Sequence, residues 1–390
     1  MITVETALEQ LFALVSPGAV EELPLAEAAG RVLARPVSTS LTQPPFAASA
    51  MDGYAVAATR VAPGARFRVI GEAAAGHGFD GIVAEDYAVR IFTGAPLPTG
   101  TDHVIIQEDV SRDGDMITLG DHFDEAAYVR PAGADFSAGM ELAAPRPLGP
   151  SEIALLAAMN ISRVPVRARP RVALLATGDE LVMPGETPGP DQIIASNSFG
   201  LKALVERLGA TAQLLPIARD NEASLRMAFE LAQDADLIVT IGGASVGDHD
   251  LVGPVAEAMG LNRSFYKIAM RPGKPLMAGR IGQVAMIGLP GNPVSAMVCG
   301  HVFLAPVIRA MLGLAPEAAP RGQARLGVDI AANGKREHYM RAVLDGEVIT
   351  PQPRQDSALL SVLAASNALL IRPIEDGPRK AGDIVDYIPL

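Results

Sequence analysis

Cysteine is almost missing from this chain. Cys299 is the single cysteine among 390 residues, which excludes an internal disulfide and argues against a metal site built from several thiolates. Such usage fits a reducing compartment. The first residues, MITVETALEQLFALVSP, contain Glu5 and Glu9 but no basic residue before their apolar face, so they predict an amphipathic helix and not an export signal. We therefore expect a cytoplasmic protein.

Long apolar runs and positive charge are also scarce. Runs such as DLIVTIGGASVG are short and broken by Gly, whereas a bilayer span requires about 20 apolar residues, so no membrane segment is predicted. The formal net charge of −12 argues against a nucleic-acid-binding surface. The exception is residues 258–316, which lack Asp and Glu and contain Arg263, Lys267, Arg271, Lys274, Arg280 and Arg309. This locally positive segment predicts an anionic small-molecule ligand.

Length and changes of pattern predict a multidomain α/β plus β protein. Helical apolar spacing occurs in ALEQLFALV and LAEAAGRVLA, and another helix is expected after Pro150. These segments form a helical and extended N-terminal domain of residues 1–43 and 130–168, expected to serve dimerisation, with a small β domain of residues 44–129 inserted. Residues 169–316 predict a central α/β domain with a mainly parallel sheet, and residues 317–390 a small C-terminal β domain.

The loops of the central domain carry its chemistry. Ligands of such sheets bind at the carboxyl ends of the strands, so the loops TGDE, ARD, GGASVGDHD, RPGKP and LPGNP are expected to gather at one edge. Gly242, Gly243 and Ser245 end a strand, where a tight turn is one interpretation and a phosphate cradle the other. Asp248 and Asp250 follow directly, which favours the cradle with a bridging Mg²⁺.

Further acids and cations lie in neighbouring loops. Asp179 and Glu180 follow a strand, where capping of a helix is an equal alternative, and Asp220 occupies the same topological place in ARDN. Their convergence favours a metal or pterin site. In RPGKP, two prolines stiffen the loop that presents Arg271 and Lys274, which suits a tetrahedral or phosphate-like dianion.

Other polar motifs give weaker signals. LPGNPVS contains Pro290 and predicts a helix capped by Asn292, with Pro293 in the first turn and Ser295 beside it. The functional interpretation adds an anion bound at that cap. Asp52 and Gly53 in SAMDGYA are explained by a turn alone. The six histidines show no metal-ligand spacing, and no nucleophilic triad is predicted.

Together these motifs resemble the molybdopterin molybdenumtransferase family, known as MoeA in bacteria and as the E domain of gephyrin in animals. The resemblance runs through PPFAASAMDGYAV, RIFTGAPLPTGTDHVIIQED, GADFSAG, LLATGDEL, GGASVGDHD, RPGKP, LPGNPVS and HYMRAVL, in that order over nearly the whole chain. It implies an elongated homodimer of four-domain subunits. It also implies Mg²⁺-dependent insertion of molybdenum from molybdate into adenylylated molybdopterin with release of AMP, and transient contact with a molybdopterin adenylyltransferase and with molybdoenzymes.

The same resemblance implies roles for individual residues. The functional acids and their threonine partner fall on Asp52, Thr93, Asp135, Glu180, Asp220 and Asp250, and we assign Mg²⁺ to Glu180, Asp220 and Asp250. The cationic positions and oxyanion partners fall on Lys267, Arg271, Lys274, Arg341, Ser295 and Ser357. Two positions depart from the family: Ala134 replaces a frequent Glu, and Asp356 replaces a usual Gly, which places a negative charge near the expected molybdate site.

Two alternatives remain. A non-catalytic paralogue would bind the pterin or a partner protein as a scaffold, which the departures at Ala134 and Asp356 would permit, and it would show pterin binding without AMP release. A nucleotide or phosphate-sugar enzyme that acquired the α/β domain would not respond to molybdate, and the SAMDGYA motif counts against it.

Overall fold

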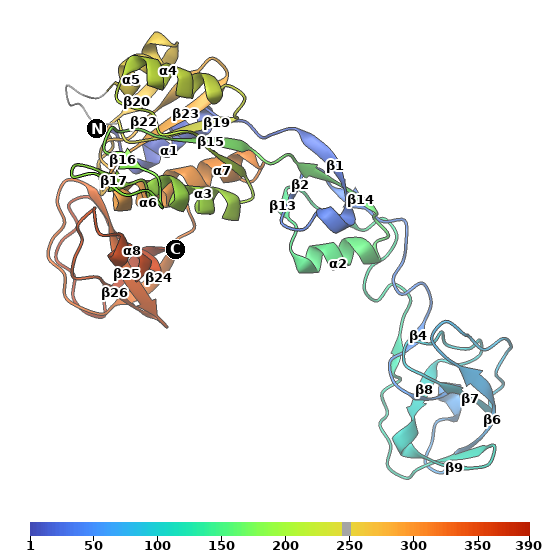
Figure 1. Cartoon of the computed structure of the whole chain (residues 1–390). Helices are drawn as coiled ribbons and strands as arrows, with labels where there is room; N and C mark the ends of the chain where they lie inside the picture. Colours follow the sequence, from blue (N-terminus) through green and yellow to red (C-terminus); the bar gives the residue numbers. More distant parts are fainter. Residues whose placement is uncertain (244–250) are drawn as a thin grey trace.

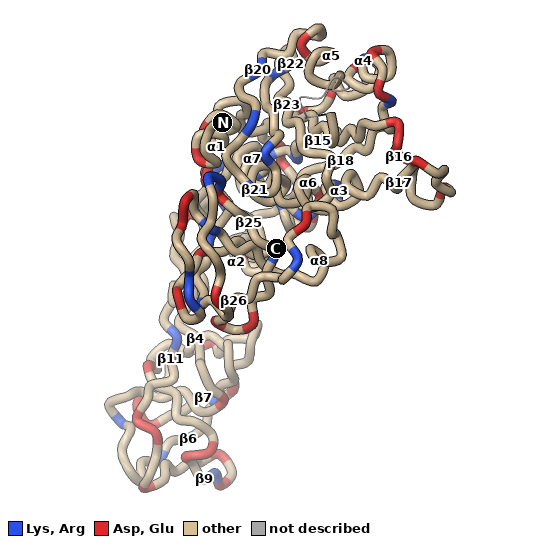
Figure 2. The backbone as a smooth tube through the Cα atoms, turned by 90° about the vertical axis from the view of Figure 1, so that its left-hand side faces the viewer, with Lys and Arg blue, Asp and Glu red and all other residues tan. Residues whose placement is uncertain are grey.

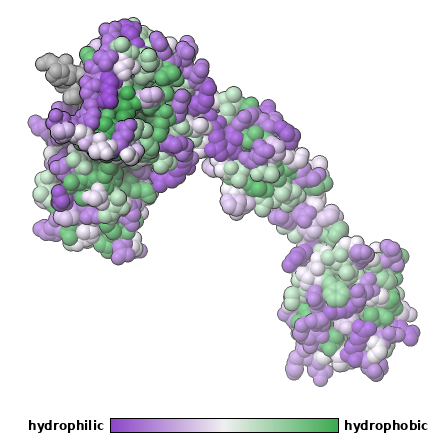
Figure 3. All heavy atoms as spheres, viewed as in Figure 1, coloured by the Kyte–Doolittle hydropathy of each residue, from purple (hydrophilic) through white to green (hydrophobic). Residues whose placement is uncertain are grey.

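The computed structural model describes residues 1–243 and 251–390 and is elongated (Figure 1). The α/β unit and the C-terminal β unit lie together at one end, and the inserted β unit lies at the other. A small sheet with one helix forms the connection between them, and the space-filling view shows these bodies as separate lobes (Figure 3). These separate units confirm the prediction of a multidomain α/β fold.

The first helix, α1 (Val4–Ala13), joins the core of the α/β unit. It begins where the Thr3 hydroxyl accepts a hydrogen bond from the backbone N–H of Thr6 at 3.1 Å. Its buried side chains recur every three or four residues, which is the spacing of one helix face, and they are Val4, Ala7, Leu8 and Leu11. The helix predicted from ALEQLFALV is therefore confirmed.

The connecting unit contains a sheet of order β1-β14-β2-β13, namely β1 (Val20–Pro24), β14 (Arg163–Arg167), β2 (Val32–Leu33) and β13 (Arg146–Pro147), and helix α2 (Pro150–Ala158). The prediction of a helix for LAEAAGRVLA is wrong. This segment forms a short 3-10 turn, Leu25–Glu27, which is followed by β2. Leu33 pairs with Val166 in β14, a partner that local apolar spacing does not indicate.

The inserted unit is a six-stranded sheet of order β8-β5-β7-β6-β10-β9. Its strands are β5 (Gly53–Val56), β6 (Arg66–Ala73), β7 (Tyr87–Ile91), β8 (His103–Ile106), β9 (Val110–Asp113) and β10 (Met116–Leu119). Two-residue strands link it to the connecting unit: β3 (Val37–Ser38) with β12 (Glu141–Leu142), and β4 (Ala48–Ser49) with β11 (Val129–Arg130).

The α/β unit has the sheet order β18-β15-β19-β23-β22-β20. The parallel strands are β15 (Arg171–Ala176), β18 (Thr211–Leu214), β19 (Leu237–Ile241) and β23 (Val284–Leu289), and the antiparallel edge is β20 (Leu261–Tyr266) and β22 (Met277–Ile281). Helices α3 (Asn197–Arg207), α6 (Pro293–Cys299) and α7 (Ala305–Met311) pack with α1 on one face. Helices α4 (Glu222–Leu231) and α5 (Val252–Ala258) cover the other face.

The stretch Pro293–Met311 runs through α6, a π-helical turn (Gly300–Leu304) and α7. Its 19 residues have a mean hydropathy of 1.6 and meet the length and composition of a membrane span, but 78% of the stretch is buried within the protein. Such burial is typical of a core helix. Cys299 within it is fully buried, which raises the pKa of its thiol and matches its predicted place in the core.

The C-terminal unit closes into a barrel because β25 pairs with both β26 and β27. Its strands are β24 (Gly322–Leu326), β25 (Glu337–Asp345), β26 (Val348–Pro351), β27 (Ala368–Arg372) and β28 (Ile384–Pro389), and α8 (Leu360–Ala364) lies between β26 and β27. A short strand of the α/β unit, β21 (Met270–Arg271), pairs in parallel with β25 and joins the two units.

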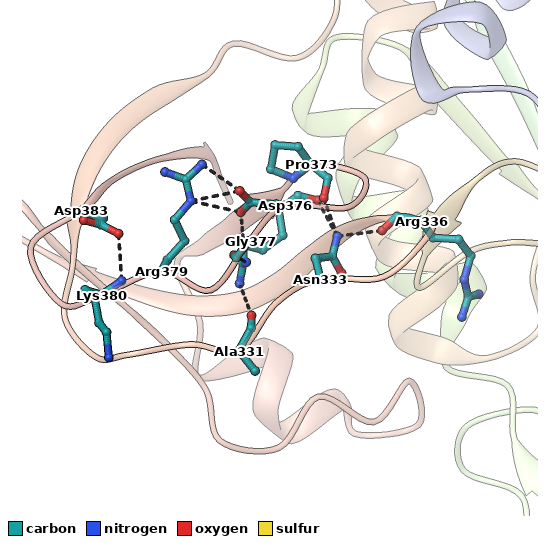
Figure 4. Close-up of polar contacts among 10 residues, drawn as sticks. Ala331, Asn333, Arg336, Pro373, Asp376, Gly377, Arg379, Lys380 and Asp383 are labelled. Atoms are coloured by element: carbon teal, nitrogen blue, oxygen red, sulfur yellow. Dashed lines mark hydrogen bonds and ion pairs between the residues drawn. The ribbon is translucent and has the colours of Figure 1, made fainter.

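A buried carboxylate holds the loops at one side of the barrel (Figure 4). Asp376 accepts hydrogen bonds from Arg372 at 2.6 Å and from Arg379 at 2.8 Å, and the side chains of Arg372 and Asp376 are only 3% and 9% exposed. Arg372 also donates to the carbonyl oxygens of Ala331 and Gly377, so it fixes two loops around one ion pair.

We expect Asp376→Ala to destabilise the barrel by about 3–5 kcal/mol, because Arg372 would stay buried without its counter-charge. Native-state hydrogen exchange of the β27 amides measures this loss. Asp329→Ala is the matched control: its partner Lys380 is 76% exposed, and an exposed pair contributes about 0–1 kcal/mol. Equal destabilisation by Asp376→Ala and Asp329→Ala would contradict the role of Asp376 as the buried counter-charge of Arg372.

Candidate functional site

A pocket of about 770 Å³ lies at the carboxyl edge of the parallel strands. Its lining combines the ends of β15, β19 and β23 with the start of α6 and the loop that carries β16 (Leu181–Val182) and β17 (Ile193–Ile194). Of the predicted site residues, the structure brings Glu180, Asp220, Gly242, Gly243, Pro290, Asn292 and Pro293 together in this lining. The predicted gathering of TGDE, ARD and LPGNP at one edge is thus observed.

Two loops of the pocket require glycine. Gly178 has φ +146°, and a Cβ there would lie 2.3 Å from a carboxylate oxygen of Glu180, so the Glu180 side chain folds back over its own loop. Gly242 has φ +96°, and a Cβ would lie 2.9 Å from the carbonyl oxygen of Thr177. Gly242 therefore permits close approach between two strand ends that line the pocket, and Gly178 leaves room for the Glu180 side chain.

Arg219 and Asp179 fasten the two acidic loops to each other. The guanidinium of Arg219 donates to the carbonyl oxygen of Asp179 at 2.9 Å, and the Asp179 carboxylate accepts from the backbone N–H of Asp220 at 3.3 Å. Asp179 thus serves the loop itself, whereas Glu180 and Asp220 reach the pocket. The sequence suggested capping for Asp179 and Glu180 alike, and it offered no reason to select Arg219.

Glu180 and Asp220 are suited to a divalent cation. Within residues 1–243 and 251–390, neither carboxylate forms an ion pair with Lys, Arg or His, so their negative charges are uncompensated in a shared pocket. The same described residues contain no group of three or more metal-ligating side chains. Two carboxylates fit Mg²⁺, which is commonly held by one or two carboxylates together with water and substrate phosphates. Ser245 and Asp250, also predicted here, lie outside the described residues.

The RPGKP loop places Arg271 beside the barrel. Arg271 lies in β21 and is paired with His338 of β25, and both Arg271 and Lys274 are exposed. Figure 2 shows basic residues on the chain around β21 and acidic residues beside β16. Of this loop only Pro275 lines the pocket, so the predicted edge position holds for part of the motif. Lys267 is half-buried and stacks on Tyr266, with its ammonium 5.0 Å from the ring centre.

Asn292 is the N-cap residue of α6 and Pro293 opens the helix, as predicted, but the Asn292 side chain makes no capping hydrogen bond. Its amide donates instead to the Ser357 hydroxyl at 3.2 Å, and the carbonyl oxygen of Ser357 accepts from the N–H of Val294 at 3.0 Å. The barrel loop thus supplies the acceptor at the start of α6. Ser295 is 4% exposed beside this junction.

Arg341 is a buried cation that its surroundings do not satisfy. The side chain is 0% exposed, and its Nη2 donates to the carbonyl oxygen of Asp356 at 3.1 Å. Its Nε and Nη1 are buried without a hydrogen-bond partner. Burial and the charge of Arg271 lower the pKa of Arg341, and Asp356 opposes them. Since buried donors are normally paired, the two unpaired nitrogen atoms point to an anionic ligand.

The carboxylate of Asp356 bends back to its own loop. It accepts from the backbone N–H of Ala358 at 2.9 Å, yet its charge remains close enough to raise the pKa of Arg341. The side chain therefore has a local turn function and an electrostatic cost for an anion at Arg341.

We expect Asp356→Asn to lower, about 2- to 5-fold, the KM for molybdate, the substrate that the resemblance implies, because the amide oxygen keeps the turn while the repelling charge is removed. Steady-state kinetics over a molybdate series measures it. Asp345→Asn, at the end of β25, serves as the control and should leave this KM unchanged. A higher KM in Asp356→Asn would show that the carboxylate assists binding.

The remaining predicted residues lie elsewhere. Asp52 and Thr93 belong to the inserted unit, where the Thr93 N–H and hydroxyl both donate to one Asp52 carboxylate oxygen at 2.8 Å. These two bonds hold the pKa of Asp52 below its usual value, with a smaller contribution from Arg90. Asp135 is exposed where Gln43 pairs with Phe136, and Ala134 precedes it. Within this chain, β4 and β16 lie at opposite ends of the molecule, so these residues do not reach the pocket (Figure 1).

Family models match three successive parts of the chain. Residues 2–160 match the "MoeA N-terminal region (domain I and II)", residues 173–310 the "Probable molybdopterin binding domain", and residues 323–390 the "MoeA C-terminal region (domain IV)". The chain is 34% identical to molybdopterin molybdenumtransferase of Haemophilus influenzae, with 100% of this chain and 98% of that protein covered. The enzyme of the same name from Nostoc is 36% identical over 88% of this chain and 83% of its own length.

Comparison with solved structures also finds MoeA proteins. A molybdopterin biosynthesis MoeA protein from Pyrococcus horikoshii superposes with a TM-score of 0.87 at 27% identity, and 100% of each chain is covered. The fold and the sequence matches together define a transferase of molybdenum cofactor biosynthesis on a multidomain α/β scaffold. Within that class, the chain belongs to the molybdopterin molybdenumtransferase family. The resemblance inferred from the eight motifs is confirmed.

Proposed function

We propose that this protein inserts molybdenum from molybdate into adenylylated molybdopterin, with Mg²⁺, and releases AMP. Family membership supports the pathway, and the observation that carries the chemistry is the shared pocket of Glu180 and Asp220. Glu180 and Asp220, with Asp250, would hold Mg²⁺, which when bound neutralises and polarises the phosphoryl group. Gly242 and Gly243 have no side chain and would let the backbone approach the substrate closely, although the N–H of Gly242 itself donates to the carbonyl oxygen of Leu289 at 3.1 Å.

The basic groups would hold molybdate. Arg341 has two buried donors without partners, and Ser357 lies between it and the pocket residue Asn292. Arg271 lies beside the barrel strand β25, and Arg271 and the exposed Lys274 of the same loop would add positive charge. An oxyanion fits this set because tetrahedral dianions are bound by several convergent N–H and O–H donors.

A homodimer would complete the site. Asp52, Thr93 and Asp135 lie far from the pocket of their own chain, so the inserted unit of one subunit would have to reach the pocket of its partner. The upstream adenylyltransferase and the molybdoenzymes are proposed as transient partners in the cytoplasm.

The first experiment is AMP release from adenylylated molybdopterin by the purified protein with Mg²⁺, with and without molybdate. Molybdate-stimulated release supports the proposal, whereas tight pterin binding without release supports the scaffold alternative.

Subunit mixing tests the shared site. Asp52→Asn and Asp220→Asn proteins, each expected to have strongly reduced AMP release, are unfolded, mixed in equal amounts and refolded. Random pairing gives one intact site in each mixed dimer, so about a quarter of wild-type activity should return if two subunits build each site. No recovery in confirmed mixed dimers would place each site within one chain.

A further inference from the structure

Arg90, in β7 of the inserted unit, fastens the turn that carries Asp52. Its Nη1 donates to the carbonyl oxygen of Gly53 at 3.0 Å, and its Nη2 donates to the side-chain oxygen of Gln107 at 2.6 Å. The backbone N–H of Gln107 in turn donates to the carbonyl oxygen of Asp52 at 3.1 Å. These three bonds close a ring around two successive residues, Asp52 and Gly53.

The guanidinium is also fixed from the side. Tyr54 lies opposite Arg90 in the β5–β7 pairing, and its ring centre is 5.1 Å from the guanidinium carbon. Phe92, two residues along the chain, places its ring centre at 4.7 Å. A planar guanidinium between two rings loses rotational freedom and keeps the direction of its N–H groups, which an ammonium on a flexible stem would not do.

Residues at the end of β7 therefore position both the side chain of Asp52 and the backbone of its turn. Thr93, three residues after Arg90, donates its N–H and hydroxyl to Oδ1 of Asp52, while Arg90 controls the backbone of the turn. Among the described residues, both hydrogen bonds accepted by the Asp52 side chain go to Oδ1, so Oδ2 is open to a ligand. The two hydrogen bonds from Thr93 therefore fix Oδ1 of Asp52 and leave Oδ2 accessible to a ligand.

We propose that Arg90 is a positioning residue, which holds the Asp52 turn so that the Asp52 carboxylate meets the substrate in one orientation. This inference rests on the proposed function, since it needs Asp52 to act in the reaction. It does not make Arg90 a substrate ligand, because its N–H groups are directed at Gly53 and Gln107.

The test combines Arg90→Met, Arg90→Lys and Asp52→Asn, with Arg112→Met as the matched control, at an exposed position of β9 on the far edge of the same sheet. We expect Arg90→Met to lower kcat for AMP release about 10- to 100-fold, because small misplacement of a reacting group has effects of this size. Arg90→Lys keeps the charge but not the planar fork and should give an intermediate kcat. Arg112→Met should match the wild type.

Two further readouts separate positioning from a general structural role. In the Asp52→Asn background, Arg90→Met should reduce kcat by less than about twofold, because residues that act as a unit are not additive. A carboxyl ¹³C NMR titration, assigned with Asp52→Asn, should show a higher Asp52 pKa in Arg90→Met, since a favourable positive charge is lost.

Additive losses in the double variant, or wild-type kcat in Arg90→Met, would overturn the inference while leaving the proposed function intact. If the wild type releases no AMP, the proposed function fails, and the titration alone decides about Arg90. An Asp52 pKa that does not change in Arg90→Met, with thermal unfolding equal to wild type, would then overturn the inference.

Discussion

Arg341→Met is expected to stabilise the protein and to abolish its use of molybdate. Arg341 is 0% exposed, and two of its buried nitrogen atoms have no hydrogen-bond partner, so the native state bears a desolvated charge. An apolar side chain of similar length removes that penalty, and replacing buried ionic groups in this way is often stabilising. We expect a gain of about 1 kcal/mol in the free energy of unfolding.

The functional loss should be large in the same variant. If Nε and Nη1 bind molybdate, their removal eliminates a buried charge-assisted contact, worth about 2–5 kcal/mol, and the KM for molybdate should rise at least about 30-fold. Thermal unfolding and AMP release over a molybdate series measure the two effects. Arg325→Met, at an exposed position of the same barrel, should change neither. A destabilised variant with normal molybdate response would assign Arg341 to the fold alone.

Asp220→Asn is expected to lower AMP release about 100- to 1000-fold or more, which corresponds to several kcal/mol of metal-assisted stabilisation of the transition state. The amide keeps the size of the carboxylate but loses its charge and much of its affinity for Mg²⁺. Within the described part of the chain, the Asp220 side chain makes no hydrogen bond, and only its backbone N–H contacts Asp179. The fold should therefore remain intact.

The comparison for this variant is Asp234→Asn, another exposed acid of the same unit that does not line the pocket. Its AMP release should equal that of the wild type. Pterin binding, measured by fluorescence, should persist in Asp220→Asn while turnover is lost. Unchanged turnover in Asp220→Asn would remove this residue from the mechanism.

Local patterns in the sequence predicted most elements of the α/β unit. Each of its parallel strands is a short apolar run that ends in a Gly-rich or acidic loop, and parallel strands bring such loops to one edge. The pattern was misleading in LAEAAGRVLA, where helical spacing encodes a strand whose partner β14 begins 130 residues after the position of Leu33. Pairing over that distance depends on the whole connecting unit, which no local window contains.

Motif order in the sequence alone determined the family, and loop chemistry predicted an anionic ligand and selected Glu180 and Asp220 as candidates. The tertiary structure decided which of the predicted residues meet: it placed Asp52 and Thr93 at the far end of the chain from the pocket, and it left Arg341 buried with free donors. It also separated Asp179 and Arg219, which hold loops, from the acids that reach the pocket. These distinctions depend on side-chain direction and burial, which are set by packing between distant segments and are not encoded in residue type or spacing.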